Sequence, residues 1–386
     1  MKNYLKNKFI ETFNNEPELY LSCGGRFEVL GNHTDHNHGL CIAATCSLSI
    51  FASIRKRDDL LVRVYSEGFD EYTIDLSKLD KLDNEIGKSS ALIRGIVSYL
   101  AKEYRYGGFD IYMMSQIPGG AGVSSSAAFE LLIAQTVNKL FNNEQIPLMT
   151  LCKASQFAER NYYGKMCGLL DQIGVAYGGL VYIDFVDIAN PEVKTLKSHM
   201  DDYSFLIVNS GGSHAGLDHL YKAIPDDMFK VAHYFGKEYL REVDEEQFRQ
   251  NKQDVIEKCG LSAYQRAEHF YGENNRVRNA YKAINNNDID TLIKLINESR
   301  VSSTDLLKNM YVDKIEGSPL EACELILKAS NNKAGVKING GGFAGSVIAL
   351  VPNSVLENVK NAAISRYGVK NVHLVSVRND IPSEIK

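Results

Sequence analysis

The stretch from Pro118 to Ala128, rich in glycine and serine, carries the clearest chemical signal in the sequence. Glycines let backbone N–H groups approach a phosphate closely, and successive N–H groups form an anion-binding concavity. A strand pattern at 109–117 precedes the stretch and an apolar helical pattern at 127–140 follows it, so the helix N-terminus adds a favourable field. We predict a phosphate-binding loop in which the hydroxyls of 124–126 contact phosphate or Mg²⁺. The simpler alternative is a glycine turn before a serine-capped helix.

Other nucleotide-binding motifs do not fit this chain. No Lys follows these glycines as the Walker pattern requires, and the H-R-D loop of protein kinases is absent. A second cluster, Gly340 to Gly345, matches G-x-G-x-x-G in letters. A strand pattern at 346–351 follows it, whereas a dinucleotide fingerprint opens a helix. We therefore expect a glycine-rich hairpin that allows close approach of a backbone or a ligand.

The remaining segments mix strand and helix patterns without strict alternation, which favours an α+β architecture. We expect helices at 1–19, 88–104, 148–163 and most of 214–300, and strands at 41–54, 60–65, 178–185, 203–208 and 372–377. Segment 20–25 is expected to be a short strand that enters a turn. Because 386 residues exceed one ordinary core, we expect two domains, 1–195 and 196–386, divided within the polar stretch 187–202.

The composition is that of a globular protein, with 44% hydrophobic and 24% charged residues. A net charge of −5 gives no broad basic surface, so we expect no nucleic-acid partner. Seven cysteines without a C-x-x-C pair predict reduced thiols. The N-terminal segment does not resemble a signal peptide, and no apolar run could span a bilayer. We expect a cytoplasmic monomer without a membrane partner.

Several segments, in order along the chain, resemble galactokinases of the GHMP kinase superfamily (galacto-, homoserine, mevalonate and phosphomevalonate kinases). Gly25 to Asn37 is similar to the galactokinase signature G-R-x-N-x-I-G-E-H-T-D-Y-N. The two glycine-rich stretches resemble the second and third motifs of the superfamily. Cys167 to Gln172 is similar to the galactokinase segment C-G-x-x-D-Q, and similar pieces recur at 273–277 and 298–299. The resemblance implies a two-domain α+β GHMP kinase fold with the active site between the domains.

The same resemblance implies that ATP phosphorylates the anomeric hydroxyl of galactose, giving galactose 1-phosphate. Asp171 is the implied base, because a sugar hydroxyl is a poor nucleophile until a carboxylate accepts its proton. Arg26 is its implied partner, which keeps Asp171 ionised and stabilises charge on the transferring phosphoryl group. The alternatives are a helix-capping Asp171 and a surface salt bridge for Arg26.

The resemblance also assigns the substrate and cofactor contacts. Ser126 and Glu159 are the implied Mg²⁺ ligands, since both offer hard oxygens, although Glu159 could instead be a solvated helix residue. ATP is expected along the loop formed by Gly119, Gly120, Ala121, Gly122, Val123, Ser124, Ser125 and Ser126. The sugar is expected at Asn32, His33, Thr34, Asp35, Gly168 and Tyr221. Asp35 could accept two adjacent sugar hydroxyls, and Tyr221 could instead be a core residue.

Four positions depart from the galactokinase pattern. Asn32 replaces a Glu that accepts a hydrogen bond from a sugar hydroxyl, and an amide is neutral and can also donate. The other replacements are His36 for Tyr, Glu28 for Asn and Lys337 for Arg. Because Asn32 and His36 lie in the sugar-facing segment, we expect altered selectivity at the hydroxyl that position 32 contacts.

These departures keep alternative functions open. One is a kinase for another sugar, such as arabinose, a uronic acid or a galactose derivative. A second is a non-catalytic sugar sensor, although the serines of the loop and Asp171 are all retained here. A third possibility is a zinc site formed by His33, Asp35, His36 and His38, which would require these neighbours to converge in a fixed geometry.

Overall fold

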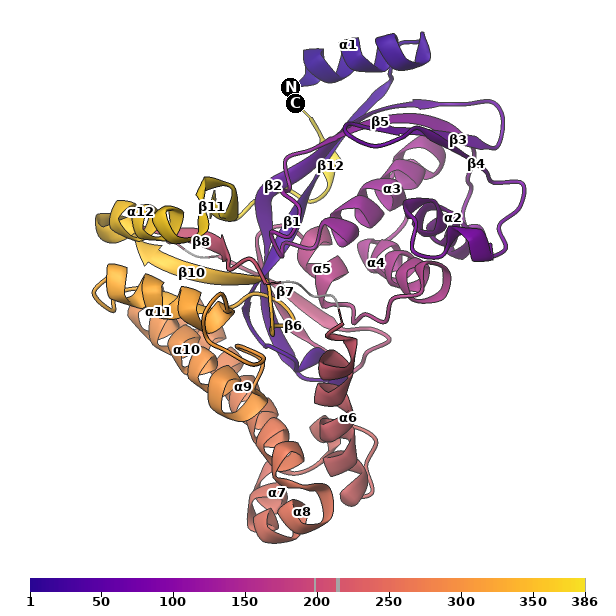
Figure 1. The fold of residues 1–386 in the computed structure, drawn as a ribbon. Helices are drawn as coiled ribbons and strands as arrows, with labels where there is room; N and C mark the ends of the chain where they lie inside the picture. The colour runs from indigo at the N-terminus through magenta and orange to yellow at the C-terminus, as the bar shows by residue number, and fades with distance from the viewer. Residues whose placement is uncertain (198, 213–215, 386) are drawn as a thin grey trace.

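The computed structural model describes residues 1–197, 199–212 and 216–385, and it is built on two β-sheets with helices packed against them (Figure 1). Both helices and strands are extensive, which confirms the α+β class. Residues 214 and 215, where the long helical region was expected to begin, lie outside the described residues.

The first sheet has eight strands in the order β12-β1-β2-β5-β3-β4, with β6 paired to β2 and β7 paired to β6. The 17-residue strand β2 is its centre, because β1, β5 and β6 all pair with it. The strands are β1 (Leu19–Leu30), β2 (Leu40–Lys56), β3 (Leu61–Ser66), β4 (Tyr72–Asp75), β5 (Phe109–Ser115), β6 (Leu180–Asp184), β7 (Glu192–Leu196) and β12 (Ser383–Glu384).

Helices cover both faces of this sheet. One face packs against α2 (Ser89–Leu100), α3 (Ser125–Asn142), α4 (Leu148–Ala158) and α5 (Leu170–Ala176) through a large apolar core. Helix α1 (Lys2–Phe13) covers part of the other face. Its Leu5, Phe9 and Phe13 recur every four residues and pack around Tyr112 of β5, as helical periodicity predicts.

The second sheet has four strands in the order β11-β8-β10-β9. They are β8 (Tyr203–Asn209), β9 (Gly335–Ile338), β10 (Ser346–Pro352) and β11 (Val372–Val375). Helices α11 (Pro319–Ala329) and α12 (Leu356–Tyr367) pack on one face. The other face shares an apolar core with the first sheet, α9 (Leu261–Asn285) and α10 (Ile289–Ser302). This shared core fixes the two sheets relative to each other.

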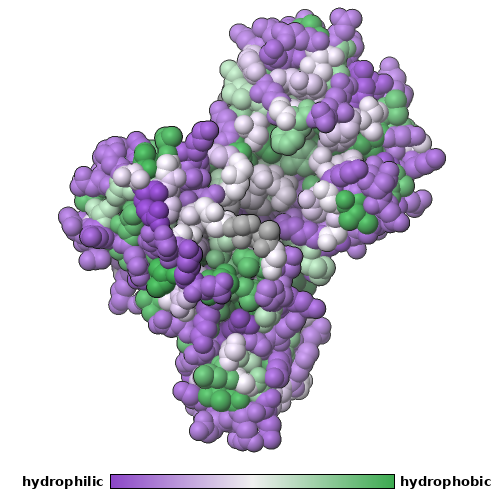
Figure 2. All heavy atoms as spheres, viewed as in Figure 1, coloured by the Kyte–Doolittle hydropathy of each residue, from purple (hydrophilic) through white to green (hydrophobic). Residues whose placement is uncertain are grey.

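A helical arm extends from the body and contains α6 (Asp218–Tyr234), α7 (Glu245–Gln250), α8 (Lys252–Cys259) and the first half of α9. Figure 2 shows the surface hollowed where the two sheet-centred parts and this arm meet. The hollow is lined mainly by residues of intermediate hydropathy, in contrast with the hydrophilic outer surface. No helix in the described part of the chain is long and apolar enough to cross a membrane.

The segment expected to be a polar separator at 187–202 was partly misinterpreted, because Glu192–Leu196 forms β7 in the first sheet. The chain then passes from the first sheet to the second between β7 and β8. The C-terminal segment returns to the first sheet, where β12 pairs with β1.

The turn expected at Gly24-Gly25 is also wrong, because β1 continues to Leu30 with two irregularities in its pairing with β2. Instead of forming a turn, the glycines allow another segment to pack closely against β1. A Cβ atom at Gly25 would lie 2.3 Å from the carbonyl oxygen of Val123, far inside van der Waals contact. Glycine therefore lets the 118–128 loop lie directly against β1.

Candidate active site

The glycine-serine loop connects β5 to α3, as the sequence predicts. Ala121 and Val123 are buried in the core that the two sheets share, whereas Gly120, Gly122 and Ser125 are exposed. The two buried side chains anchor the loop, and the exposed positions leave its outer backbone open to a ligand. Ser124 has a left-handed φ of 54° and makes no capping hydrogen bond, so it is not an ordinary helix cap.

Carbonyl groups of the loop are held from behind by the rest of the protein. Arg26 donates to the loop twice, from Nη1 to Gly122 O at 2.8 Å and from its backbone N–H to Val123 O at 2.8 Å. Further donors to loop carbonyls are Asn209 and Ser346, both to Gly120 O, and Asn339, to Gly122 O. In a trans peptide the N–H lies opposite the C=O, so the N–H groups of Val123 and Ser124, which follow the held carbonyls of Gly122 and Val123, face the opposite side. The Ala121 N–H instead donates within the loop, to Pro118 O at 3.2 Å. With the first turn of α3, the N–H groups of Val123 and Ser124 form a concavity suited to an anion.

Asp171, in the first turn of α5, lies against this loop. Its Oδ1 accepts a hydrogen bond from Arg26 Nε at 2.8 Å, and its Oδ2 accepts one from the Ser124 hydroxyl at 2.6 Å. The Arg26 side chain is only 8% exposed, so the pair is not a surface salt bridge. Sequence reasoning predicted the partnership of Arg26 but missed the contact with Ser124.

The electrostatics of Asp171 favour its ionised form. Burial alone would raise the pKa of this carboxyl. The charge and hydrogen bond of Arg26, together with the Ser124 hydroxyl, outweigh burial and hold the pKa below its ordinary value. Asp171 is therefore a carboxylate at neutral pH, with both oxygens oriented by neighbouring donors.

Ser126 and Glu159 come together as predicted, with Ser126 Oγ 3.5 Å from Glu159 Oε1. Glu159 is buried where α4 passes into a π-helical turn (Glu159–Tyr163), so it is not a solvated helix residue. Such turns are frequent at functional sites. Lys165 and Gln172 also contact its carboxylate, at 2.7 and 3.2 Å. No sequence pattern indicated that Lys165 would contact Glu159, because this contact depends on how the 164–169 segment folds.

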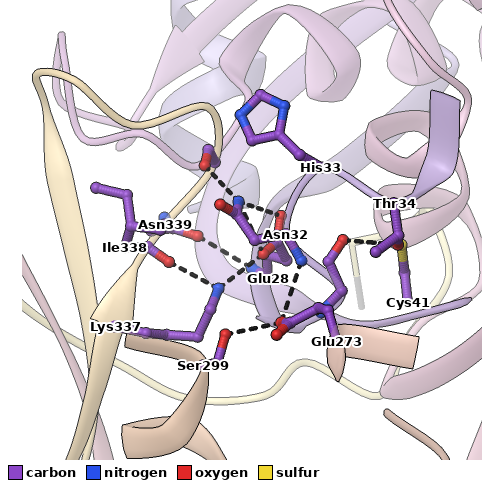
Figure 3. Close-up of polar contacts among 12 residues, drawn as sticks. Glu28, Asn32, His33, Thr34, Cys41, Glu273, Ser299, Lys337, Ile338 and Asn339 are labelled. Atoms are coloured by element: carbon purple, nitrogen blue, oxygen red, sulfur yellow. Dashed lines mark hydrogen bonds and ion pairs between the residues drawn. The ribbon is translucent and has the colours of Figure 1, made fainter. Parts of the chain in front are cut away.

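The sugar segment, 31–40, is a compact loop between β1 and β2 that α9 holds from outside. Glu273 Oε1 accepts hydrogen bonds from the N–H groups of Gly31 and Asn32, and Asn274 Oδ1 accepts one from Leu40 N. The Ser299 hydroxyl donates to the same Glu273 oxygen at 2.7 Å (Figure 3). The pieces at 273–277 and 298–299 thus position this loop.

Thr34 and Asn32 do not present free side chains. Thr34 is fully buried, and its hydroxyl lies 2.9 and 2.8 Å from the carbonyl oxygens of Gly31 and Leu40. Asn32 is 1% exposed, and its amide contacts Glu28, Gly340 O and Asn309. In this fold the Thr34 hydroxyl closes the loop, and a contact of Thr34 with sugar stays a prediction.

Asp35 lies where the sugar segment meets the segment that leads into α5. A Cβ atom at Gly168 would lie only 2.0 Å from Asp35 Oδ2, so any other residue there would displace this carboxylate. Burial, followed by the negative charges of Asp171 and Glu28, raises the pKa of Asp35 to about 6. The structure thus brings Asp35, Gly168 and Asp171 together from distant parts of the sequence.

The cluster at Gly340 to Gly345 forms the antiparallel connection between β9 and β10, which confirms the predicted hairpin and leaves no helix for a dinucleotide site. His33 Nε2 lies 2.8 Å from Gly341 O, so this nitrogen carries the proton. Tyr221 donates from its hydroxyl to Gly342 O at 2.7 Å. His33 and Tyr221 therefore meet at the hairpin, and Tyr221 is only partly buried.

The clustered histidines make aromatic contacts, and the ring centroids of His33 and His36 lie 5.7 Å apart. His36 packs near Phe229, and the His38 ring stacks on Tyr239 with centroids 3.7 Å apart. Within the described residues, no group of three or more His, Cys, Asp and Glu side chains is placed to hold a metal ion. The zinc interpretation has no geometric support in that part of the chain.

Two family models match the chain in the regions that form this site. Residues 7–56 match the galactokinase galactose-binding signature, and residues 91–179 match the N-terminal domain of GHMP kinases. The galactokinase of Actinobacillus pleuropneumoniae serotype 5b (strain L20) is 30% identical over 364 residues, which cover 93% of this chain and 92% of that protein. This chain belongs to the galactokinase family.

Further comparisons agree with this family membership. The galactokinase of Glaesserella parasuis serovar 5 (strain SH0165) is 29% identical over 388 residues, 97% of each chain. The crystal structure of Lactococcus lactis galactokinase complexed with galactose covers 100% of both chains with a TM-score of 0.85 at 25% identity. Methanococcus jannaschii mevalonate kinase shares the fold, with a TM-score of 0.66 at 16% identity over 94% of this chain and 98% of that one. The resemblance to galactokinases and the GHMP kinase fold are confirmed.

Proposed function

We propose that this galactokinase family member transfers the γ-phosphoryl group of ATP to the anomeric hydroxyl of galactose, giving galactose 1-phosphate. One observation carries the proposal: the Asp171 carboxylate is held by Arg26 and Ser124 at the junction of the phosphate loop and the sugar segment. The similarity to a galactokinase complexed with galactose supports galactose as the substrate.

In this proposal Asp171 accepts the proton of the anomeric hydroxyl as that oxygen attacks the γ-phosphorus. Arg26 and Ser124 keep the carboxylate ionised and fix its orientation. Arg26 also donates to the loop carbonyl of Gly122, so one guanidinium links the base to the phosphate loop. That position suits it to stabilise the negative charge that develops on the transferring group.

The loop from Gly119 to Ser126 would hold the ATP phosphates on its outward N–H groups and hydroxyls. Ser126 and Glu159 fit a Mg²⁺ ion, because they place two hard oxygens 3.5 Å apart. Mg–O bonds are about 2.0–2.1 Å long, so one ion can contact both. Mg²⁺ would supply charge neutralisation of the phosphates. Lys165 forms an ion pair with this same Glu159 oxygen, so Mg²⁺ would replace the lysine there or share the oxygen with it.

We propose that the sugar lies between Asp35, His33, Gly168 and Tyr221, close to Asp171. The ionised Asp35 can accept hydrogen bonds from two adjacent hydroxyls. His33 uses Nε2 to hold Gly341, which leaves Nδ1 as an acceptor for a third sugar hydroxyl.

We further propose that the two sheets mark the domains 1–195 and 196–386, with the β12 strand returning to the first. Monomeric state and cytoplasmic location remain predictions.

A second candidate is a kinase for a related sugar, which the uncharged, buried Asn32 favours. A sugar panel with ATP distinguishes the candidates: galactose, arabinose, galacturonic acid and galactosamine, each assayed for ADP release. Galactose as the best substrate by kcat/KM supports the main proposal, and preference for another sugar supports the second. Sugar binding without turnover of any sugar would indicate a sensor.

A further inference from the structure

The carboxylate of Glu159 already has a cation beside it, the side-chain ammonium of Lys165. Lys165 Nζ lies 2.7 Å from Glu159 Oε1, and Ser126 Oγ lies 3.5 Å from the same oxygen. The Glu159 side chain is 3% exposed, whereas that of Lys165 is 57% exposed. The lysine therefore reaches a buried carboxylate from the solvent side and places a positive charge on the oxygen that Ser126 also contacts.

The backbone around Glu159 fixes the lysine in this place. Helix α4 ends in the π-helical turn Glu159–Tyr163, and Gly164 closes the turn with a left-handed φ of 93°. Glycine adopts this conformation without the steric cost that a Cβ atom adds. The N–H groups of Gly164 and Lys165 both donate to the Glu159 carbonyl oxygen at 3.0 Å. The backbone of Lys165 is therefore hydrogen-bonded to the same residue that its side chain neutralises.

The two oxygens of the Glu159 carboxylate have different surroundings. Its Oε2 lies against the fully buried side chain of Gln172, whose Nε2 donates to it at 3.2 Å. The oxygen beside Ser126 is Oε1, and within the described residues Lys165 forms the one ion pair of this carboxylate, on that oxygen. A metal ion between Ser126 and Glu159 must therefore use the oxygen that Lys165 holds.

Two cations on this oxygen would repel each other. A Mg–O bond is about 2.0–2.1 Å long, so an ion on Oε1 and an ammonium 2.7 Å from it would lie within about 5 Å of each other. Like charges at that separation repel, and a partly buried position screens them less than open water does. Because more than half of the Lys165 side chain is exposed, its ammonium can turn toward solvent, whereas the buried Glu159 carboxylate cannot.

We propose that Lys165 is a resident counter-ion of Glu159, which a divalent metal ion must displace in order to bind this carboxylate. The inference deepens the proposed function and rests on it. In the metal-free protein the lysine offsets the cost of a buried, unpaired carboxylate. It also disfavours binding of a metal ion that arrives without ATP. An ion that arrives with ATP brings negative phosphate charge, which offsets the repulsion between the ion and the ammonium. Lys165 thus favours entry of the metal as Mg·ATP over entry of the bare ion.

The test measures Mn²⁺ binding to the nucleotide-free protein by electron paramagnetic resonance, for the natural protein and for Lys165→Met. Glu159→Gln defines how much Mn²⁺ binds elsewhere on the protein, and this amount is subtracted. Removal of the competing ammonium should tighten the Glu159-dependent binding by at least about threefold. A lysine that only held Glu159 in place would have the opposite effect, because its loss would weaken metal binding.

A second measurement adds a saturating non-hydrolysable ATP analogue. The phosphate charge should then offset the repulsion, so the natural protein and Lys165→Met should bind Mn²⁺ with affinities within about twofold of each other. A variant that keeps its full advantage in the presence of the analogue would overturn the preference for Mg·ATP.

Matched variants separate the charge from the side chain. Lys165→Arg keeps the positive charge and should bind Mn²⁺ within about twofold of the natural protein. Lys333→Met, at an exposed position between α11 and β9, removes a lysine charge elsewhere and should also stay within about twofold. If Lys165→Met did not fold, Lys165→Gln removes the same charge with a polar side chain, and the same tightening is expected.

Unchanged or weaker Mn²⁺ binding to the nucleotide-free protein after loss of the Lys165 charge would overturn the inference. Absence of Glu159-dependent Mn²⁺ binding in the natural protein and in the neutral variants alike would also overturn it. Absence of galactose phosphorylation would contradict the proposed function instead, and the Mn²⁺ affinities, which need no turnover, would still decide the role of Lys165.

Discussion

Arg26 Nε lies 2.8 Å from Oδ1 of Asp171, although 145 positions separate the two residues in the chain. Arg26 comes from the centre of β1 and Asp171 from the first turn of α5. The pair joins the sugar signature to the segment 167–172, and Ser124 joins both to the phosphate loop. The proposed proton transfer to Asp171 depends on these contacts among Arg26, Asp171 and Ser124.

Replacement of Asp171 by Asn should lower kcat by about 10²–10⁴-fold, because an amide cannot accept the hydroxyl proton. The affinity for galactose, measured by calorimetry, should change by less than about fivefold. Asp70→Asn, at an exposed position far from these contacts, is the matched control and should keep normal kcat. Near-normal turnover by Asp171→Asn would remove Asp171 from the role of base.

The pKa of Asp35, raised to about 6, predicts an acid limb in kcat/KM for galactose. Above this pH the ionised carboxylate accepts sugar hydroxyls, and below it protonation removes that capacity. The pH profile of kcat/KM reports groups of the free enzyme, so the limb should lie near pH 6. A profile that stays flat down to pH 5 would contradict the role of Asp35.

The same shift predicts a change in stability. The folded-state pKa of Asp35 exceeds the ordinary value of 3.8, so its ionisation opposes folding as pH rises from about 4 to 6. Asp35→Asn should therefore raise the unfolding free energy at pH 7.5 by up to about 3 kcal/mol. The gain should shrink at pH 4.5. A Tm below that of the natural protein at pH 7.5 would count against this account.

Gly168→Ala should displace the Asp35 carboxylate, since the new methyl group would lie 2.0 Å from its present oxygen position. We expect KM for galactose to rise at least about tenfold, because one misplaced hydrogen-bonding group costs that much or more. KM for ATP should change by less than about threefold. Steady-state kinetics with each substrate varied in turn measures both, and a rise in the KM for ATP alone would refute the placement.

Ser126→Ala and Glu159→Gln should each raise the Mg²⁺ concentration required for half-maximal activity, since each removes a hard oxygen ligand. Binding of Mn²⁺ with a non-hydrolysable ATP analogue, followed by electron paramagnetic resonance, gives a readout independent of turnover. Glu103→Gln, at an exposed position outside the site, is the matched control for removal of a carboxylate and should leave the metal affinity unchanged. Unchanged metal affinity in both variants would exclude this pair as ligands.

Motif order and periodicity predicted much of this architecture. The strand–loop–helix unit around 118–128 and the 340–345 hairpin have local signatures, because glycine positions and alternation of apolar residues determine them directly. The extension of β1 through Gly24-Gly25 was missed, because a glycine pair that permits close packing has the same sequence signature as one that permits a turn. The backbone carbonyls beside the pair, that of Cys46 at Gly24 and that of Val123 at Gly25, distinguish the two cases.

The composition of the site was harder to predict than its motifs. Lys165 and the Ser124–Asp171 hydrogen bond depend on three-dimensional proximity, and no local spacing encodes them. The contact of Glu28 with Lys337 spans 309 positions. Taken separately, the two replacements were unexplained departures from the family pattern. Their ion pair shows that the two positions are in contact and that Lys337 neutralises the charge of Glu28.

The most direct test of the proposed function is the identity of the product formed from [1-¹³C]galactose and Mg·ATP. We predict a phosphate monoester whose ³¹P signal shows coupling to carbon 1, formed by the natural enzyme and reduced by at least about 100-fold with Asp171→Asn. A phosphate on another carbon, or no phosphorylated sugar at all, would contradict the account.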